Sequence, residues 1–289
     1  MTEVAVIIPH FNDVVRLRRC LTALVGEGGA GIPDNVDVVV VDNNSTDDIG
    51  PLRDEFPMVR FVIETKPGAA EARNRGVRET TAPMLFFLDA DCVPARNWLE
   101  TGMRLAGSAD VIGGRIDTFD ETPPPRSGAE AFETVFAFHQ RDYIERMGFS
   151  VTANLITSRS VFEATGDFRA GVSEDRDWCL RAGEKGFRLV YEDALRVGHP
   201  TRSDWHSLAK KWRRIMSEGF HLSGTDAFGR MKWSVRAFAV AASAVVHAPR
   251  IVTSTALSST TERVRGVVTL FRIRIWRAGY MIWQAAGGE

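Results

Sequence analysis

The chain has 289 residues, of which 44% are apolar and 25% are charged. This composition fits one large or two small globular domains, and it excludes a disordered tail protein, a collagen-like repeat and a coiled coil. Its three cysteines lie far apart with no CxxC pair, which argues against a disulfide-stapled secreted protein and a thiolate zinc site. The N-terminal residues lack the pattern of a signal peptide, so we expect a reducing, cytoplasmic setting.

Charge is distributed unevenly along the chain. The net charge is −1, yet the segment from Thr201 onward holds 14 Lys and Arg against 5 acids, so the preceding body is strongly acidic. A basic tail of this kind predicts an anionic partner: a phosphorylated substrate, nucleic acid or a membrane surface. Because no nucleic-acid recognition motif accompanies the basic residues, we expect no nucleic-acid partner.

Short apolar runs alternate with helix-length segments in the first half of the chain. The runs predict strands buried on both faces, as in a parallel sheet, and the alternation predicts an α/β fold. In such sheets ligands bind beyond the carboxyl ends of the strands. The expected strands are residues 4–9, 36–42, 59–64 and 84–91, and the expected helices are 13–26, 46–56 and 68–80.

The middle of the chain is less regular, and the last part is helical. We expect further strands at 110–116, 151–157 and 187–191, helices at 129–147 and 175–185, and a Pro-rich loop at 118–126. Residues 203–289 predict a helical extension. Its longest uncharged run, 237–249, has 13 residues, fewer than the roughly 20 that span a bilayer.

One segment of this extension, residues 264–282, has an amphipathic pattern. Basic amphipathic helices with flanking aromatic residues are typical of the membrane interface. The alternative is a helix packed on its own domain with a solvated basic face. The apolar stripe consists of Val264, Val267, Val268, Phe271, Ile275, Ala278 and Ile282, and the arginines expected off it are Arg265, Arg272, Arg274 and Arg277.

Carboxylates follow two of the expected strands. Asp89 and Asp91 come directly after an apolar run, and two carboxylates so placed can hold one divalent cation. The alternative is an aspartate that caps the next helix. Asp42 ends an earlier strand, where a carboxylate suits hydrogen bonds to a nucleobase or ribose, although the polar residues that follow it also suit a turn or a helix cap.

Two other segments carry candidate chemistry. Residues 66–76 open a helix with small residues and bring two arginines, which suits close approach to a phosphate-bearing ligand. Glu174 and Asp175 begin a later helix, where they act either as dipole-favoured capping acids or as a general base. His199 follows a strand-like run and is a candidate third metal ligand or a structural histidine.

Seven motifs stand in one order and spacing over about residues 3–200. They are IIPHFN at 7–12, VVVDNNSTD at 39–47, KPGAAEARNRG at 66–76, FLDAD at 87–91, TANLITSRSVFEATGDF at 152–168, SED at 173–175 and VGH at 197–199. Any one of them is weak, but together they are specific. The set resembles glycosyltransferase family 2, whose members are inverting enzymes of GT-A fold.

The resemblance implies a Rossmann-like, mostly parallel sheet flanked by helices, with a helical C-terminal extension. It implies that Asp42 contacts the nucleotide base and that Asp91, with Asp89, holds Mn²⁺ or Mg²⁺ on the donor diphosphate. His199 would be a further metal or diphosphate contact. Asp175, paired with Glu174, would be the catalytic base. The other side chains expected around the nucleotide sugar are Pro9, Phe11, Asn12, Asn44, Lys66, Gly68, Arg73, Asn74, Ala90 and Asn154.

The basic run at 210–214 resembles motifs of family members that act at membranes on lipid-linked or polymer acceptors. We therefore expect Lys210, Arg213 and Arg214 to lie near the phosphate of an acceptor or diphosphate. The expected segments are a nucleotide-sugar-binding half at 1–116, an acceptor-binding and catalytic half at 117–202, and a membrane-associating extension at 203–289.

The expected function is sugar transfer from a nucleoside-diphosphate sugar, UDP-linked, to a hydroxyl of a lipid, lipid-linked or polysaccharide acceptor. The setting would be the inner face of the membrane. One alternative is a catalytically inactive nucleotide-binding scaffold at the membrane. The other is a sugar-phosphate nucleotidyltransferase, which usually has a Gly-rich basic loop after the first strand, where this chain reads PHFNDVV.

Overall fold

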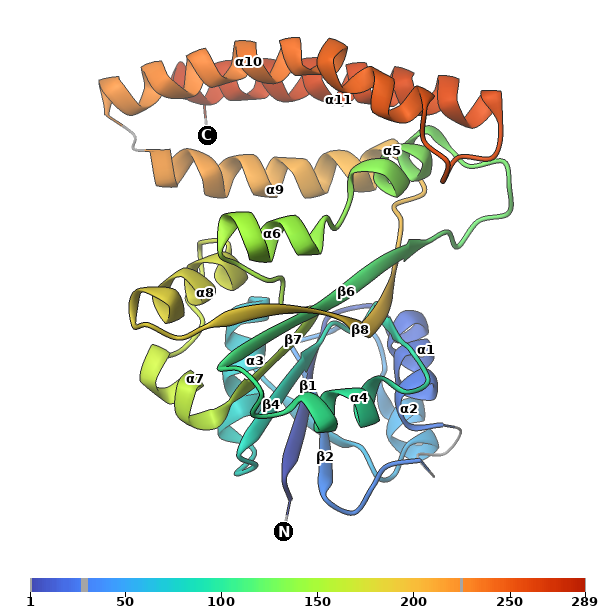
Figure 1. Cartoon of the computed structure of the whole chain (residues 1–289), viewed down its shortest axis with the longest axis vertical. Helices are drawn as coiled ribbons and strands as arrows, with labels where there is room; N and C mark the ends of the chain where they lie inside the picture. The colour runs from blue at the N-terminus through green and yellow to red at the C-terminus, as the bar shows by residue number, and fades with distance from the viewer. Residues whose placement is uncertain (1, 27–30, 224–225, 289) are drawn as a thin grey trace. The chain divides into compact units, whose positions relative to one another are not determined.

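A computed structural model of the chain describes residues 2–26, 31–223 and 226–288 (Figure 1). It divides into two compact units. Unit 1 comprises Met1–Asp117 and Phe138–His199, and unit 2 comprises Thr118–Ala137 and Pro200–Glu289. These units cut across the three segments expected from the sequence, because residues 118–137 group with the C-terminal helices.

Unit 1 is built on a sheet of eight strands in the order β3-β2-β1-β4-β7-β6-β8-β5. The first four in this order are parallel to one another, so their carboxyl ends share one edge. They are β1 (Val4–His10), β2 (Val36–Asp42), β3 (Arg60–Ile63) and β4 (Met84–Leu88). All four were expected from their apolar runs, and the α/β class is confirmed.

The remaining strands depart from the parallel arrangement. β7 pairs antiparallel with β4 and with β6, and β5 pairs antiparallel with β8. Their bounds are β5 (Val93–Pro94), β6 (Val111–Phe119), β7 (Asn154–Ser158) and β8 (Leu189–Pro200). Strands β3, β2, β1 and β4 therefore form a continuous parallel run, and antiparallel pairs lie beyond it.

Helices cover both faces of this sheet. Alternate residues of β1 fall in two separate apolar clusters, as the strand period of two requires. One cluster holds buried residues of α1, α2 and α4, and the other holds buried residues of α3, α7 and α8. Their bounds are α1 (Val14–Val25), α2 (Gly50–Glu55), α3 (Ala69–Arg78), α4 (Trp98–Leu105), α7 (Arg159–Thr165) and α8 (Glu174–Glu184).

The helix expected at 129–147 is two helices, α5 (Gly128–Phe136) and α6 (Gln140–Met147). Phe138 lies between them with a φ of 51°, in the left-handed region that interrupts a helix. The strand expected at 187–191 is likewise longer, because β8 continues to Pro200. Helices α4 and α7 and the short β5 were not predicted.

Unit 2 is helical, as expected for the C-terminal extension. It contains α5 and three longer helices: α9 (Trp205–Ser223), α10 (Ala227–Val252) and α11 (Thr260–Ala285). Helices α10 and α11 pack along each other (Figure 1). Capping residues fix where they begin: Asp226 accepts the backbone N–H of Gly229, and Ser259 accepts that of Glu262.

A buried ionic cluster joins α5 to α9 in unit 2. Glu133 of α5 is 1% exposed. Its carboxylate accepts the Lys211 ammonium at 2.7 Å and the Arg202 guanidinium at 3.0 Å. Although burial raises the pKa of Glu133, the two cations hold it below its ordinary value. Each charge of this cluster therefore has a partner of opposite sign.

Candidate active site

The carboxyl ends of β1 and β2 place His10 beside Asp42. The two residues are partners in the parallel register, and Nδ1 of His10 lies 3.1 Å from Oδ1 of Asp42. The backbone N–H of Asp13 donates to Nε2 of His10 at 3.1 Å. Because Nε2 is an acceptor, the proton lies on Nδ1 and is donated to Asp42. The second Asp42 oxygen accepts the backbone N–H of Ser45 at 3.3 Å, so the carboxylate has a fixed orientation.

Asn12 holds the loop that follows β2. Its side-chain oxygen accepts the backbone N–H of Thr46 at 2.7 Å and that of Asp47 at 3.3 Å. Asn12 and Asn44 both have positive φ, at 48° and 68°, which asparagine tolerates better than other non-glycine residues. Asn44 is exposed at the same edge. The polar residues after Asp42 therefore form a hydrogen-bonded turn, as the sequence predicts.

Asn43 is a site residue that sequence reasoning missed. It is buried, and its amide donates to the backbone oxygens of Glu64 at 3.0 Å and Lys66 at 2.6 Å. Its side-chain oxygen accepts the backbone N–H of Gly68 at 2.7 Å. Asn43 therefore ties the end of β2 to the start of α3. Gly68 has a φ of 123°, in the left-handed region that favours glycine.

Arg73 of α3 links the residues after β4 to the start of α8. It is 4% exposed, and its guanidinium forms ion pairs with Asp89 at 2.6 Å and with Glu174 at 2.9 Å. The sequence predicts Arg73 as a phosphate contact, and this role stays a prediction. The structure adds that Arg73 fixes two predicted site carboxylates with one guanidinium.

Asp175 is half-buried at the first turn of α8. One of its oxygens accepts the Ser173 hydroxyl at 3.0 Å and the backbone N–H of Arg176 at 2.7 Å. Burial raises the pKa of Asp175 above its ordinary value, and the neighbouring Glu174 raises it further. A carboxylate with a raised pKa is a stronger base once it is deprotonated. Asp175 thus has the electrostatic character expected of a general base.

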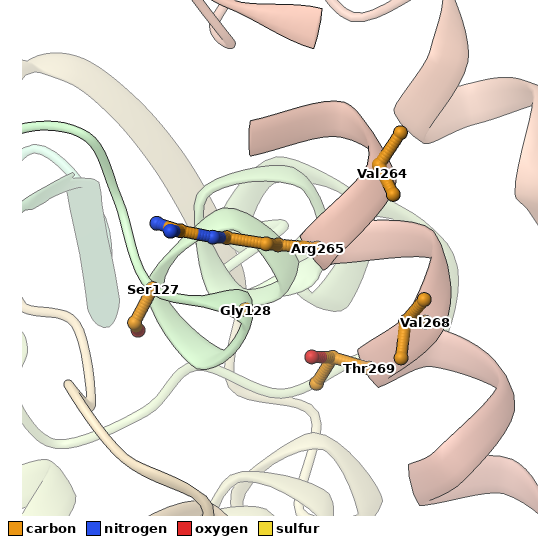
Figure 2. A pocket seen from close by; sticks show the side chains of 6 residues that line it. All are labelled: Ser127, Gly128, Val264, Arg265, Val268 and Thr269. Atoms are coloured by element: carbon orange, nitrogen blue, oxygen red, sulfur yellow. The ribbon is translucent and has the colours of Figure 1, made fainter. Parts of the chain in front are cut away.

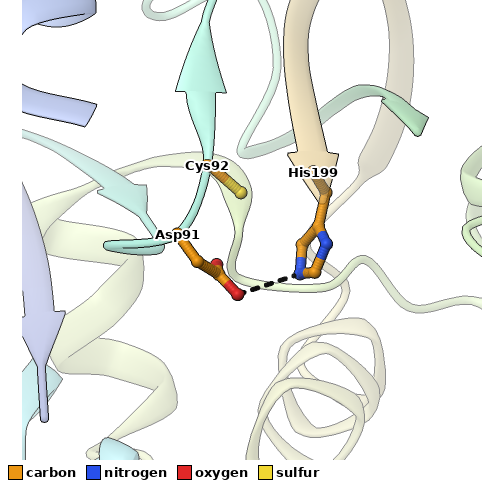
Figure 3. A group of neighbouring side chains, drawn as sticks. All are labelled: Asp91, Cys92 and His199. Atoms are coloured by element: carbon orange, nitrogen blue, oxygen red, sulfur yellow. Dashed lines mark ion pairs between the residues drawn. The ribbon is translucent and has the colours of Figure 1, made fainter. Parts of the chain in front are cut away.

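Asp91, Cys92 and His199 form a candidate metal centre (Figure 3). One potential ligand atom from each lies within 4.8 Å of the other two, and Oδ2 of Asp91 is 3.4 Å from Nε2 of His199. The ring of Phe138 packs on His199 with 4.4 Å between ring centres. Figure 3 shows the Asp91 carboxylate and the His199 ring facing each other from separate segments.

The donor set of this centre can hold a divalent cation. Burial raises the pKa of the Cys92 thiol well above its ordinary value, with Asp91 and Asp89 adding to the rise. Sulfur is a soft ligand, so the Asp91 carboxylate and the His199 imidazole are the donors that suit a harder cation. Oxygen and imidazole donors suit Mn²⁺ or, with more oxygen ligands, Mg²⁺. Cys92 was not expected near the metal.

Two predicted nucleotide-sugar contacts are buried. Asn154 is 0% exposed; its side chain accepts the Trp98 indole N–H at 2.9 Å and donates to two backbone carbonyls. Asn74 is 3% exposed, and its amide bonds both backbone polar groups of Phe168, at 2.9 and 3.0 Å. The polar atoms of both amides are occupied by these hydrogen bonds, and contact of either residue with a ligand stays a prediction. They hold neighbouring segments in place.

The other predicted residues of unit 1 differ in exposure. Phe11 is 61% exposed and Lys66 is exposed, so both side chains can meet a ligand from solvent. Pro9 is half-buried and Ala90 is buried, which leaves their backbone as the part that a ligand can approach.

Lys210, Arg213 and Arg214 are exposed on α9 of unit 2. Arg214 pairs with Glu218 at 3.8 Å, and the Arg213 guanidinium lies 5.9 Å from the ring centre of Trp276. Their role toward an acceptor stays a prediction.

An open pocket of about 440 Å³ lies between α5 and α11 in unit 2 (Figure 2). It is lined by Ser127, Gly128, Val264, Arg265, Val268 and Thr269. A Cβ on Gly128 would fall 2.2 Å from the Thr269 hydroxyl and 3.0 Å from the Arg265 carbonyl, so glycine permits the close approach of the two helices. No predicted site residue lines this pocket.

An α/β sheet with carboxylates after its parallel strands, and an acidic helix start linked to them through Arg73, agrees with the GT-A fold. The family model for "Glycosyl transferase family 2" matches residues 5–171, and the chain belongs to this family. The protein is therefore a glycosyltransferase.

Several known proteins are similar to the chain. The glycosyltransferase AglE of Haloferax volcanii is 29% identical over 73% of this chain and 71% of its own length. The pre-mycofactocin glycosyltransferase of Mycobacterium tuberculosis is 30% identical over 70% of this chain, which spans only 44% of that protein. The structure of mannosyltransferase PcManGT from Pyrobaculum calidifontis, in complex with GDP-Man and Mn²⁺, aligns with a TM-score of 0.55. It shares 17% sequence identity, over 99% of this chain and 76% of that one, which supports the fold.

Proposed function

We propose that the protein is an inverting, metal-dependent glycosyltransferase that acts at the cytoplasmic face of a membrane. It moves a sugar from a nucleoside-diphosphate sugar to a hydroxyl of a lipid, lipid-linked or polysaccharide acceptor. The observation that carries the proposal is the ion-paired group at one edge of the sheet. There, Arg73 joins Asp89 to Glu174, and the Asp91–His199 pair is the candidate metal centre.

The donor would bind along the carboxyl edge of β1, β2 and β4. Asp42, oriented by His10 and the Ser45 backbone, presents a carboxylate to the base or ribose of the nucleotide. Asp91, His199 and Asp89 would hold Mn²⁺ or Mg²⁺. When bound, this cation supplies positive charge to the diphosphate as its negative charge grows. The similarity to PcManGT, solved with GDP-Man and Mn²⁺, supports this assignment.

Asp175 would accept the proton of the acceptor hydroxyl. The hydroxyl oxygen forms a bond to the anomeric carbon while the bond from that carbon to the diphosphate oxygen breaks. One displacement of this kind inverts the configuration of the sugar and needs no covalent enzyme intermediate. Glu174, fixed by Arg73 at 2.9 Å, is the adjacent acid that raises the basicity of Asp175.

A donor screen tests the proposed reaction. The protein is mixed with UDP- and GDP-sugars in Mn²⁺, in Mg²⁺ and in EDTA, and release of the nucleoside diphosphate is measured. We expect release from one donor class, dependent on the cation, and a product of inverted anomeric configuration by proton NMR. Turnover that is unaffected by EDTA would contradict metal dependence, and retained configuration would contradict the single displacement.

The outer side of α10 supports the membrane setting. Apolar residues recur along this helix at intervals that keep them on one side, and each is more than half exposed. They are Phe228, Met231, Val235, Phe238, Val245, Val246 and Val252. Helix α10 is long and apolar enough to cross a membrane by length and composition, and only 17% of its apolar window is buried. Large exposed apolar surfaces of this kind mark interaction sites with membranes or proteins.

Only part of the apolar stripe predicted for α11 is exposed and could contact a membrane. Val264, Val268, Ile275 and Ile282 are exposed, whereas Ala278 is buried within unit 2. Arg277, expected on a solvated basic face, is 8% exposed. The correction arises because α11 packs against α5, α9 and α10, so its buried surface is broader than one apolar stripe.

Flotation with liposomes tests the membrane setting. We expect the full-length protein to float with phosphatidylcholine vesicles that contain phosphatidylglycerol, because the apolar side of α10 and its cations contribute together. The double variant Phe238→Glu/Val245→Glu should stay in the soluble fraction. The matched control is Val15→Glu/Met58→Glu, which places the same two charges at exposed apolar positions of unit 1. Equal flotation of all three proteins, or none by the unaltered protein at low salt, would contradict the proposal.

A further inference from the structure

Three side chains of unit 2 bury hydrogen-bond donors that have no acceptor. These donors are Nε of Arg274, Nε of Arg277 and the indole Nε1 of Trp212, none of which has a partner within the described part of the chain. The guanidinium carbon of Arg277 lies 3.7 Å from the ring centre of Trp212, so α11 and α9 bring two of them together. A buried donor without a partner is costly, and one acceptor group with several oxygens can satisfy more than one such donor.

The charges around Arg277 have the same sign as its own. Burial lowers the pKa of Arg277 to about 9, and the next causes are the positive charges of Arg274 and Arg236. The Arg274 guanidinium lies 3.3 Å from Nδ1 of His247, which is a neutral acceptor when the ring is uncharged. The cations that surround Glu133 have a carboxylate partner, whereas the charges that act on Arg277 from the described residues are those of other arginines.

We propose that Arg236, Arg274 and Arg277 form a binding site for a phosphate group, with the Trp212 indole as a further donor. A phosphate presents several acceptor oxygens and up to two negative charges, which matches three guanidinium groups and an N–H. A single carboxylate would leave more donors unsatisfied. The site consists of residues of α9, α10 and α11 in unit 2, whereas the proposed donor site consists of residues of unit 1, and it goes beyond the proposed function.

The three arginines differ in exposure, and the exposed one marks the side from which a phosphate would enter. Arg277 is buried and Arg274 is half-buried, whereas Arg236 is exposed. Arg236 follows Val235 on α10, one of the apolar residues on the exposed side of that helix. Phosphate on a lipid headgroup and free phosphate share the chemistry that these donors recognise. These residues differ from Lys210, Arg213 and Arg214, the phosphate contacts expected from the sequence.

Thermal unfolding of the full chain tests the site. Arg277→Met keeps the length and much of the volume of the side chain but removes the charge and its donors. Arg250→Gln is the matched control, because Arg250 is an exposed arginine of α10. Each protein is heated in chloride and in inorganic phosphate of equal ionic strength. A parallel pair of samples contains phosphatidylcholine vesicles with and without phosphatidic acid.

We expect phosphate to raise the Tm of the unaltered protein and the control more than that of Arg277→Met, whose Kd for phosphate should rise at least about tenfold. In chloride, Arg277→Met should be as stable as the unaltered protein or more stable, because an unpaired buried charge is removed. A rise with inorganic phosphate indicates a free phosphate site, and a rise with phosphatidic acid alone indicates a lipid headgroup. An equal Tm rise in all three proteins under both conditions, or none, would overturn the proposal.

Discussion

Replacing Asp91 by alanine is expected to abolish sugar transfer and to weaken metal-dependent binding of a nucleoside diphosphate at least about 100-fold. Asp91 is the carboxylate of the candidate metal centre, 3.4 Å from His199. The neighbouring Cys92 is a poor replacement, because a sulfur ligand suits soft cations better than Mn²⁺ or Mg²⁺. Asp89 is already ion-paired with Arg73 at 2.6 Å. Loss of Asp91 therefore removes the carboxylate that would bind the metal beside His199.

Calorimetry separates this effect from loss of the fold. UDP and GDP are titrated into Asp91→Ala with Mn²⁺ and with EDTA, and the unaltered protein is treated in the same way. The control is Asp54→Ala, which removes an exposed acid of α2 far from the strand ends in sequence. We expect a Tm within a few degrees of the unaltered protein, because the Asp91 side chain is 32% exposed. Unchanged Mn²⁺-dependent binding in a folded variant would remove Asp91 from the metal centre.

Local sequence patterns predict where the strands lie, because the burial of a strand determines its own residues. The runs at 38–41 and 84–88 are apolar throughout, because both faces of β2 and β4 are covered, and this burial is visible in the sequence. The partner of a strand is set by long-range packing instead. The antiparallel pairing of β7 with β4 and β6 therefore has no signal in residues 151–157 themselves.

The same distinction applies to the candidate site. Carboxylates at strand ends are visible in the sequence, because an unpaired charge there is costly and implies a ligand or ion partner. The position at which β2 ends determines whether Asn43 or Asn44 is buried. A shift of one residue would exchange the two, and local patterns do not locate a strand end that closely. The double ion pair of Arg73 joins residues that are 101 positions apart, which no local pattern predicts. Arg277 is buried because α11 packs against other helices of unit 2, although its own helix pattern placed it off the apolar stripe.

The variant Asp175→Asn is expected to bind donor nearly as well as the unaltered protein but to turn over at least about 100-fold more slowly. The amide is close in size to the carboxylate and can still accept the Ser173 hydroxyl and the Arg176 N–H, but it cannot take a proton from the acceptor. Glu174→Gln is the comparison variant. It removes the ion pair with Arg73 and keeps the Asp175 carboxylate, so its loss of turnover should be smaller.

Stability and pH dependence distinguish a base from a structural acid. Because burial and Glu174 raise the folded-state pKa of Asp175, its charge destabilises the fold above that pKa and has no such cost below the pKa of the unfolded chain. Asp175→Asn should therefore keep or raise the Tm at pH 7. Turnover of the unaltered protein should fall as the pH drops through the raised pKa, and Asp175→Asn should lose this dependence. A variant with near-normal turnover and the same acid limb would exclude Asp175 as the base and leave Glu174 as the residue to test, whereas a lower Tm with proportional losses in binding and turnover would mean that Asp175 is structural.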